Sequence, residues 1–253
     1  MRCLPSNIIA RVRHAQLAFL AAIPIAALGG LIGLGGAEFR LPVLAGPLRY
    51  SAKQAVPLNL AISLITLLTA LVIRSRALSL RAAAPYGGPI VAMIGGAMVA
   101  AFAGATLAGR LSGPKFERII LALLVAIGLA LIVEGFLPER TPALLPDVAL
   151  ARAAAGLLFG LGVGLVSSLL GVAGGELIIP TFVFAFGADI KTAGTCSLLI
   201  SIPTVVIGLI RYAHRGAFAD RAPLARAAAP MGIGSVIGAL VGGSLAGVAP
   251  ASL

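Results

Sequence analysis

The sequence contains no tryptophan, only two cysteines and two histidines, and few charged residues. Two cysteines, Cys3 and Cys196, are too few for a disulfide scaffold. Charged residues make up 11% of the 253 residues and hydrophobic residues 60%, whereas soluble domains are about 25% charged. With a mean hydropathy of +1.10, the chain is not an ordinary soluble domain. The composition predicts an all-α, polytopic membrane protein in a lipid bilayer, with no room for a soluble catalytic domain.

Acidic residues are scarce as well. The chain has eight of them against 19 basic residues, which gives a net charge of +11. Such a charge can indicate nucleic-acid binding, but here the basic residues stand mostly between apolar runs, as the positive-inside rule describes. We therefore expect no nucleic acid as a partner. Runs such as residues 119–133 are apolar without alternation, which excludes transmembrane β-strands.

Seven apolar segments follow one another along the chain. They lie at about 15–36, 56–73, 86–109, 119–137, 153–180, 192–210 and 224–249. Residues 15–50 and 153–188 are each too long for one span and too short for two, and each holds a glycine cluster followed by a proline. In both regions we expect a full span followed by a broken or re-entrant helix. Non-helical backbone at membrane depth is tolerated only where protein or a water-filled cavity surrounds it.

The basic residues predict an orientation. Seven spans that each cross once place 12 basic residues on the side of the N-terminus, Arg74 among them, and seven on the other side. The N-terminus is therefore predicted to be cytoplasmic. It carries Arg2, Arg11 and Arg13 and has no clear small-residue cleavage site, so we interpret it as a retained flank and not as a signal peptide.

The strongest pattern is an internal repeat. A constant shift that places Glu38 on Glu176, here called the repeat offset, aligns Leu31–Pro42 with Leu169–Pro180, and ten of the 33 positions from 31 to 63 are identical without a gap. We predict a first repeat at 1–138 with about four spans and a second at 139–253 with about three, so that the chain looks one helix short, by nature or by truncation. Such repeats are typical of secondary transporters. Whether the repeats are parallel or inverted is left open.

The two glycine clusters are the predicted substrate site. A helix that is broken there frees backbone N–H groups, and helix N-termini attract anions. Two facing breaks would form a pseudo-symmetric anion site. The alternative is close helix packing through small residues. The candidate residues are Gly33, Gly35, Gly36 and Ala37 in the first cluster and Gly171, Ala173, Gly174 and Gly175 in the second.

Polar residues near the clusters are further candidates. Glu38 and Glu176 are predicted to couple transport to protons or to gate it, because a buried carboxylate can carry a proton; the alternatives are a pair with Arg40 or Lys191, or a cap on freed N–H groups. A polar helix face that could bind substrate, or hydrogen-bond between helices, repeats in both halves. Its candidate residues are Asn59 and Ser63 with Thr66 in the first half, and Ser197 and Ser201 with Thr204 in the second. Lys53 and Lys191 are expected to mark the membrane edge.

The motifs GLGGAEFRLP and GVAGGELIIP, followed by KQAVPLNLAIS and KTAGTCSLLIS, resemble the duplicated signature of TauE/SafE-type sulfite exporters. The resemblance covers about residues 17–250, and Ala37, Arg40 and Pro57 depart from it. It implies a permease of the prokaryotic inner membrane for sulfite, organosulfonates or related small anions. We expect proton coupling, and no catalytic residue, metal or cofactor. A membrane-embedded enzyme and a thiol-redox membrane protein are the alternatives, and a homo-oligomer is left open.

Overall fold

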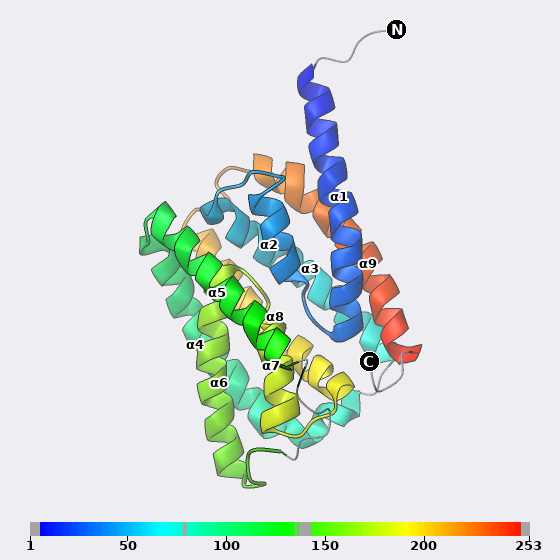
Figure 1. Ribbon diagram of the computed structural model, residues 1–253, viewed down its shortest axis with the longest axis vertical. Helices are drawn as coiled ribbons and strands as arrows, with labels where there is room; N and C mark the ends of the chain where they lie inside the picture. Colours follow the sequence, from blue (N-terminus) through cyan, green and yellow to red (C-terminus); the bar gives the residue numbers. More distant parts are fainter. Residues whose placement is uncertain (1–5, 78–79, 135, 137–142, 249–253) are drawn as a thin grey trace.

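The computed structural model describes residues 6–77, 80–134, 136 and 143–248, and every regular element in these ranges is helical (Figure 1). Six apolar stretches are long enough to span a membrane. They are built on α1 (Ser6–Ile32), α3 (Ala52–Ala77), α4 (Gly87–Arg110), α6 (Ala149–Leu170), α8 (Ile190–His214) and α9 (Ala229–Val248). The prediction of an all-helical, polytopic membrane protein is confirmed.

Six further elements complete the described part of the chain. They are α2 (Ala37–Ala45), η1 (Leu80–Tyr86), α5 (Gly113–Glu134), α7 (Gly175–Pro180), η2 (Thr181–Ala185) and η3 (Leu224–Ala228). Helix α5 occupies the fourth predicted apolar segment, but it begins with polar residues and is not among the six apolar stretches found in the described part of the chain. Residues 135 and 137–142, on which the end of that segment falls, lie outside the described residues.

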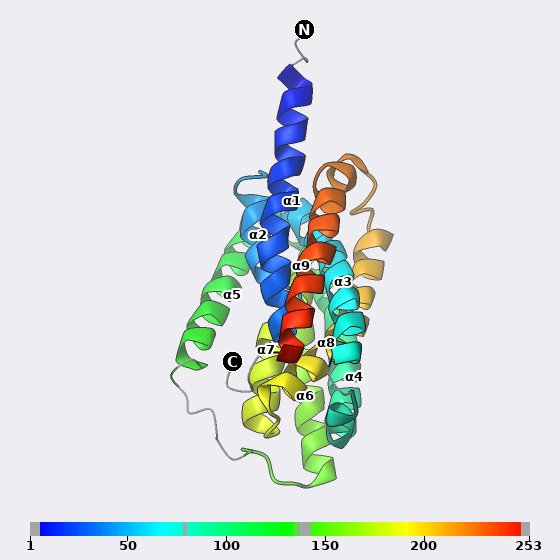
Figure 2. The ribbon, with the colours of Figure 1, turned by 90° about the vertical axis from the view of Figure 1, so that its right-hand side faces the viewer.

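Both long glycine-containing regions fold as re-entrant pairs. Helix α2 turns back along α1, and α7 with η2 turns back along α6 (Figures 1 and 2). His14 Nε2 of α1 lies 3.3 Å from the carbonyl oxygen of Leu48, just after α2. Arg152 Nη2 of α6 donates to the carbonyl oxygen of Phe186, just after η2, at 2.6 Å. The repeat offset places His14 on Arg152 and Leu48 on Phe186, so the two contacts correspond.

Positive φ angles at glycine produce the turns between the paired helices. Gly33 and Gly36 have φ values of 95° and 63°, and Gly171 and Gly174 have values of 68° and 83°. Side chains other than glycine rarely adopt this region. A Cβ atom at Gly171 would also overlap the carbonyl oxygen of Val56. Two glycines in each cluster are therefore required by backbone conformation, and at Gly171 by space as well.

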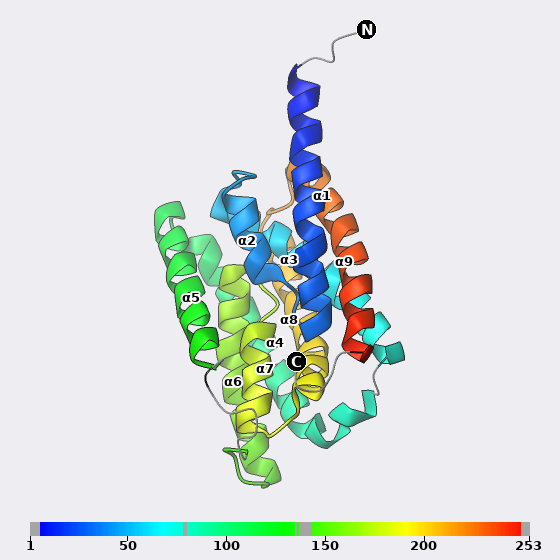
Figure 3. The ribbon, with the colours of Figure 1, turned by 45° about the vertical axis from the view of Figure 1, so that its right-hand side comes forward.

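Helices from opposite halves pack against each other, chiefly α1 with α9 and α4 with α6 (Figures 1 and 3). Small residues allow close approach of the backbones. A Cβ atom at Gly96 would overlap the carbonyl oxygen of Leu157, and one at Gly234 would lie 2.5 Å from that of Phe19. The repeat offset places Gly96 on Gly234 and Phe19 on Leu157, so these two contacts correspond as well.

Helices α3 and α8 cross in the centre in opposite directions. Gly194, near the start of α8, lies against the Arg74 side chain near the end of α3, whereas Gly208 faces Leu60 near the start of α3. The repeat and its boundaries stay a prediction. The paired contacts and the opposite directions of α3 and α8 support repeats of inverted topology.

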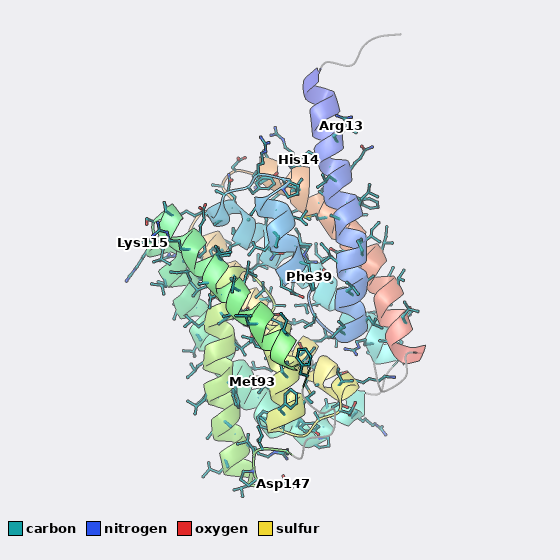
Figure 4. All side chains as sticks on the ribbon, in the orientation of Figure 1. Arg13, His14, Phe39, Met93, Lys115 and Asp147 are labelled. Carbon is teal, nitrogen blue, oxygen red and sulfur yellow. The ribbon has the colours of Figure 1, made fainter. Side chains whose placement is uncertain are left out.

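The helix ends meet at two opposite ends of the molecule. A cavity of about 550 Å³ is lined by Lys53, Phe116 and Arg215, among others, so α3 and α5 begin where α4 and α8 end. We call this the His14 end; Figure 4 shows Arg13, His14 and Lys115 there and Asp147 at the opposite, Asp147 end. Seven single crossings would separate Lys53, which precedes the second apolar segment, from Arg215, which follows the sixth. The two residues line the same cavity because α2 re-enters and does not cross.

Candidate functional site

The two glycine clusters meet in the interior of the molecule. A Cβ atom at Gly35 would lie 2.8 Å from Cβ of Ala173, its counterpart at the repeat offset. A Cβ atom at Gly175 would lie 2.9 Å from Cδ2 of Leu34 and 2.8 Å from Oγ of Ser197. The remaining candidates of the clusters are also buried. They are Gly33, Gly36, Ala37, Gly171 and Gly174.

A fully buried arginine is the centre of hydrogen bonding in the first half. Arg40 of α2 has no exposed surface and donates five hydrogen bonds. Nη2 donates to the Gly35 carbonyl oxygen at 2.6 Å and to Ser63 Oγ at 2.9 Å. The remaining acceptors are Asn59 Oδ1 at 3.3 Å, Thr66 Oγ1 at 3.0 Å and Ser235 Oγ at 3.4 Å.

In the sequence alone, Arg40 stands out only as a departure from the repeat, or as a possible partner for a glutamate. A guanidinium has five N–H donors, and here every one is used on a neutral oxygen. The polar face of α3, which carries Asn59, Ser63 and Thr66, is buried and holds Arg40. The sequence signal for this buried arginine is a mismatch between the repeats: Arg40 stands where the second repeat has Ile178.

The corresponding place in the second half is not filled in this way. Ser197 and Ser201 of α8 are fully buried, and their Oγ atoms have no hydrogen-bond partner. Ile178 stands at the position of Arg40 and is also fully buried. The two halves thus share a polar helix face. The position of Arg40 supplies no cation in the second half, where Arg74 of α3 lies against Gly194 of α8, three residues before Ser197.

A second buried arginine lies beside the first glycine cluster. Arg74 is 1% exposed, and its Nη1 donates to the carbonyl oxygen of Ile32 at 3.4 Å. Its Nε has no acceptor. A Cβ atom at Gly33 would lie within contact of Arg74 Nη1, and one at Gly194 would lie 2.6 Å from it. The assignment of Arg74 to a solvent-exposed loop is wrong, because α3 continues to Ala77 and turns this side chain inward.

The two glutamates of the motifs lie near each other. Glu176 is 2% exposed, and the carboxylate oxygens of both Glu38 and Glu176 are buried without a hydrogen-bond partner. The Glu38 carboxyl lies within electrostatic range of Arg40 and of Glu176. The backbone N–H groups of Ala37 and Glu38 also act on the Glu38 carboxylate, so a capping role for this glutamate stays a prediction.

The remaining candidates lie at the edges or carry no visible chemistry. Asp189 caps α8 by accepting from the Thr192 backbone N–H at 3.0 Å. Partial burial raises the pKa of Asp189, but the hydrogen bonds from Thr192 outweigh it and hold this pKa below its usual value. Lys53 is exposed at the start of α3. Cys196 is a buried free thiol, and Cys3 lies outside the described residues.

The fold and the interior together define an all-helical, multi-span membrane protein in which two interrupted helices meet at a buried cationic centre. Residues 17–253 match the family described as sulfite exporter TauE/SafE, and the chain belongs to that family. The family consists of membrane transporters, which implies export of sulfite or related sulfur anions and speaks against an enzyme. No curated protein and no solved structure matches the chain.

Proposed function

We propose that this protein is a permease for a small anion, with sulfite and organosulfonates as the first substrates to test. Arg74 carries the proposal. Its guanidinium is buried where the first break meets the start of α8, and in the described part of the chain no carboxylate forms an ion pair with it. An isolated buried charge is costly, so an anion that binds there is favoured.

Arg40 has a different role in this proposal. All five of its donors are used on protein oxygens, so it has no free N–H for a substrate. Its positive charge adds to the potential near the breaks and favours anions there. Arg74, with a free Nε, is the residue that would contact the substrate.

The arrangement suits alternating access. In many transporters, discontinuous helices of two inverted repeats form the substrate site near the midplane, and one repeat rocks against the other. Here the contacts that the repeat offset relates support two such halves, and the Gly35–Ala173 contact would lie on the axis between them. We propose that the anion is exposed alternately to the His14 end and to the Asp147 end.

The re-entrant pairs sharpen the predicted orientation. With α2 and α7 not crossing, most basic residues of the described ranges fall at the His14 end, which favours a cytoplasmic location for that end and for the N-terminus. The residues at the His14 end are Arg13, Arg49, Lys53, Arg110, Lys115, Arg118, Arg211, Arg215, Arg221 and Arg226. Those at the Asp147 end are Arg76, Arg81, Arg152 and Lys191.

A flux assay on the purified protein in liposomes tests the transport proposal. We expect labelled sulfite to leave protein-containing vesicles much faster than protein-free vesicles, and ethanesulfonate to compete with it. Chloride, which has a single charged atom and no oxygen acceptors, is expected to compete poorly. Flux at the rate of protein-free vesicles for every anion would contradict the proposal.

The proton-coupling proposal concerns the two glutamates. We expect Glu38→Gln and Glu176→Gln to abolish the acceleration of sulfite flux by an imposed pH gradient, because glutamine has nearly the same shape and cannot exchange a proton. Flux driven by the sulfite gradient alone should remain. Glu117→Gln, on the exposed start of α5, is the control and should keep the pH effect. A full pH effect in both interior variants would show that protons do not act through these carboxyls.

A further inference from the structure

We infer that the second half of the molecule binds a monovalent metal cation, and we assign sodium to this site. The ligands would come from the buried polar face of α8. The inference uses the correspondence between the two halves at the repeat offset, and only the role of the ion rests on the proposed transport function. Binding itself can be measured on protein that transports nothing.

The first half shows what this polar face holds. The α3 side chains that contact Arg40 do so through oxygen atoms only, and the guanidinium group that they surround is a monovalent cation. Thr66 illustrates the arrangement: its hydroxyl donates to the Ile62 carbonyl oxygen at 3.0 Å and accepts from Arg40 Nη1 at 3.0 Å. Ser63 likewise donates to the Asn59 carbonyl oxygen at 2.7 Å while it accepts from Arg40. Glu38 provides the neighbouring opposite charge.

The second half repeats the oxygen atoms without the cation. Thr204 donates to the Ile200 carbonyl oxygen at 2.8 Å, as Thr66 does to Ile62, and its acceptor lone pair is left over. The Oγ atoms of Ser197 and Ser201 have no partner at all, although both residues are fully buried. The Ala173 carbonyl corresponds to that of Gly35. Buried hydroxyls without a partner are unusual in proteins and indicate a ligand.

Ile178 explains why the second site is left for a free ion. It stands at the position of Arg40 and is fully buried, but its side chain is shorter and has no polar atom. No side chain at this position therefore supplies a polar group to the polar face of α8. Glu176, two residues earlier, corresponds to Glu38, and its buried carboxylate oxygens have no partner.

Charge and ligand type favour a small monovalent cation over the alternatives. Hydroxyl groups can also donate to an anion, but a bound cation would favour the ionised form of the carboxyl groups of Glu176 and Glu38, whose oxygens have no hydrogen-bond partner, whereas an anion would not. Calcium takes six to eight oxygens, usually with several carboxylates. In the described part of the chain, no group of three or more histidine, cysteine or acidic residues gathers. Sodium fits a site with one or two carboxylates and neutral oxygens.

Thermal unfolding in detergent tests the binding directly. We expect the midpoint temperature to rise saturably with NaCl when choline chloride keeps the ionic strength constant, because a ligand that binds the folded state stabilises it. Ser197→Ala and Ser201→Ala should each raise the sodium concentration needed for half of the effect by about tenfold or more. Ser75→Ala, exposed on α3, should respond like the wild type. Equal midpoints in sodium and choline would refute the site.

An exchange of the two corresponding residues gives a second, independent test. Ile178→Arg should supply the missing cation and remove the sodium response. Arg40→Ile should create a second sodium site, so that sodium raises its midpoint more than that of the wild type. An Ile178→Arg protein that is folded and still responds to sodium like the wild type would overturn the inference. If Ile178→Arg does not fold, the sodium responses of the serine variants and of Arg40→Ile still show whether the site exists.

The outcome separates this inference from the proposed function. A protein that binds sodium but moves no anion in liposomes keeps the cation site and loses the transport proposal. A protein that moves sulfite equally well in sodium and choline, with no sodium-dependent stabilisation, loses the cation site alone. If both hold, Glu176 serves protons and sodium, and the two ions are expected to compete.

Discussion

Replacement of Arg40 by isoleucine in choline buffer is expected to lower the free energy of unfolding by about 3–5 kcal/mol, as when one partner of a buried polar pair is removed. The hydroxyl and amide groups around Arg40 belong to fully buried residues. Removal of the guanidinium leaves Asn59, Thr66 and Ser235 with fewer partners than they have now. An unsatisfied buried polar group costs about 1–3 kcal/mol, so several of them add up to a large loss.

The matched control is Arg76→Ile. Arg76 lies on the exposed end of α3, two residues beyond Arg74, and its replacement should change stability by less than about 0.5 kcal/mol. Arg40→Lys should fall between the two, because lysine keeps the charge but has three donors in place of five. Denaturation by a graded series of detergent mixtures measures all three. Equal stability of Arg40→Ile and Arg76→Ile would show that the network around Arg40 contributes nothing to the fold.

Much of the architecture could be predicted from the sequence because it depends on local spacing. Residues 15–50 and 153–188 had the wrong length for whole spans, and both contain re-entrant pairs. The glycine clusters were predicted to be the breaks, and Gly33, Gly36, Gly171 and Gly174 have the positive φ angles that such breaks need. Close packing through small residues, the alternative for the clusters, is also seen at Gly171 against Val56, and outside the clusters at glycines such as Gly96 and Gly234.

The cationic interior could not be predicted, because it depends on contacts between distant residues. Hydropathy treats an arginine near the end of an apolar run as a loop residue, and nothing local shows that α3 turns Arg74 inward. Apart from the nearby Gly35 carbonyl oxygen, the acceptors of Arg40 come from α3 and from Ser235 of α9, which is 195 residues away in the sequence. Arg40 was visible only as a mismatch with Ile178 in an otherwise matching repeat. The roles of the glycine clusters, the polar faces and the glutamates stay predictions.

Replacement of Arg74 by glutamine is expected to reduce sulfite flux by about 100-fold. Glutamine keeps part of the hydrogen-bonding capacity and removes the charge. Loss of a buried charge that pairs with a ligand costs about 2–5 kcal/mol, which corresponds to roughly 30-fold or more in affinity or rate. The fold should be retained, because Arg74 makes one long hydrogen bond, to Ile32, whereas Arg40 makes five.

The comparison of Arg74→Gln with Arg76→Gln in the liposome flux assay tests the central claim most directly. Both residues lie near the end of α3 and both changes remove one positive charge, but Arg74 is buried beside the break and Arg76 is exposed. We predict sulfite flux near that of the wild type for Arg76→Gln, and flux near that of protein-free vesicles for Arg74→Gln with unchanged thermal stability. Equal sulfite flux in the two variants would show that the anion does not pass the buried guanidinium.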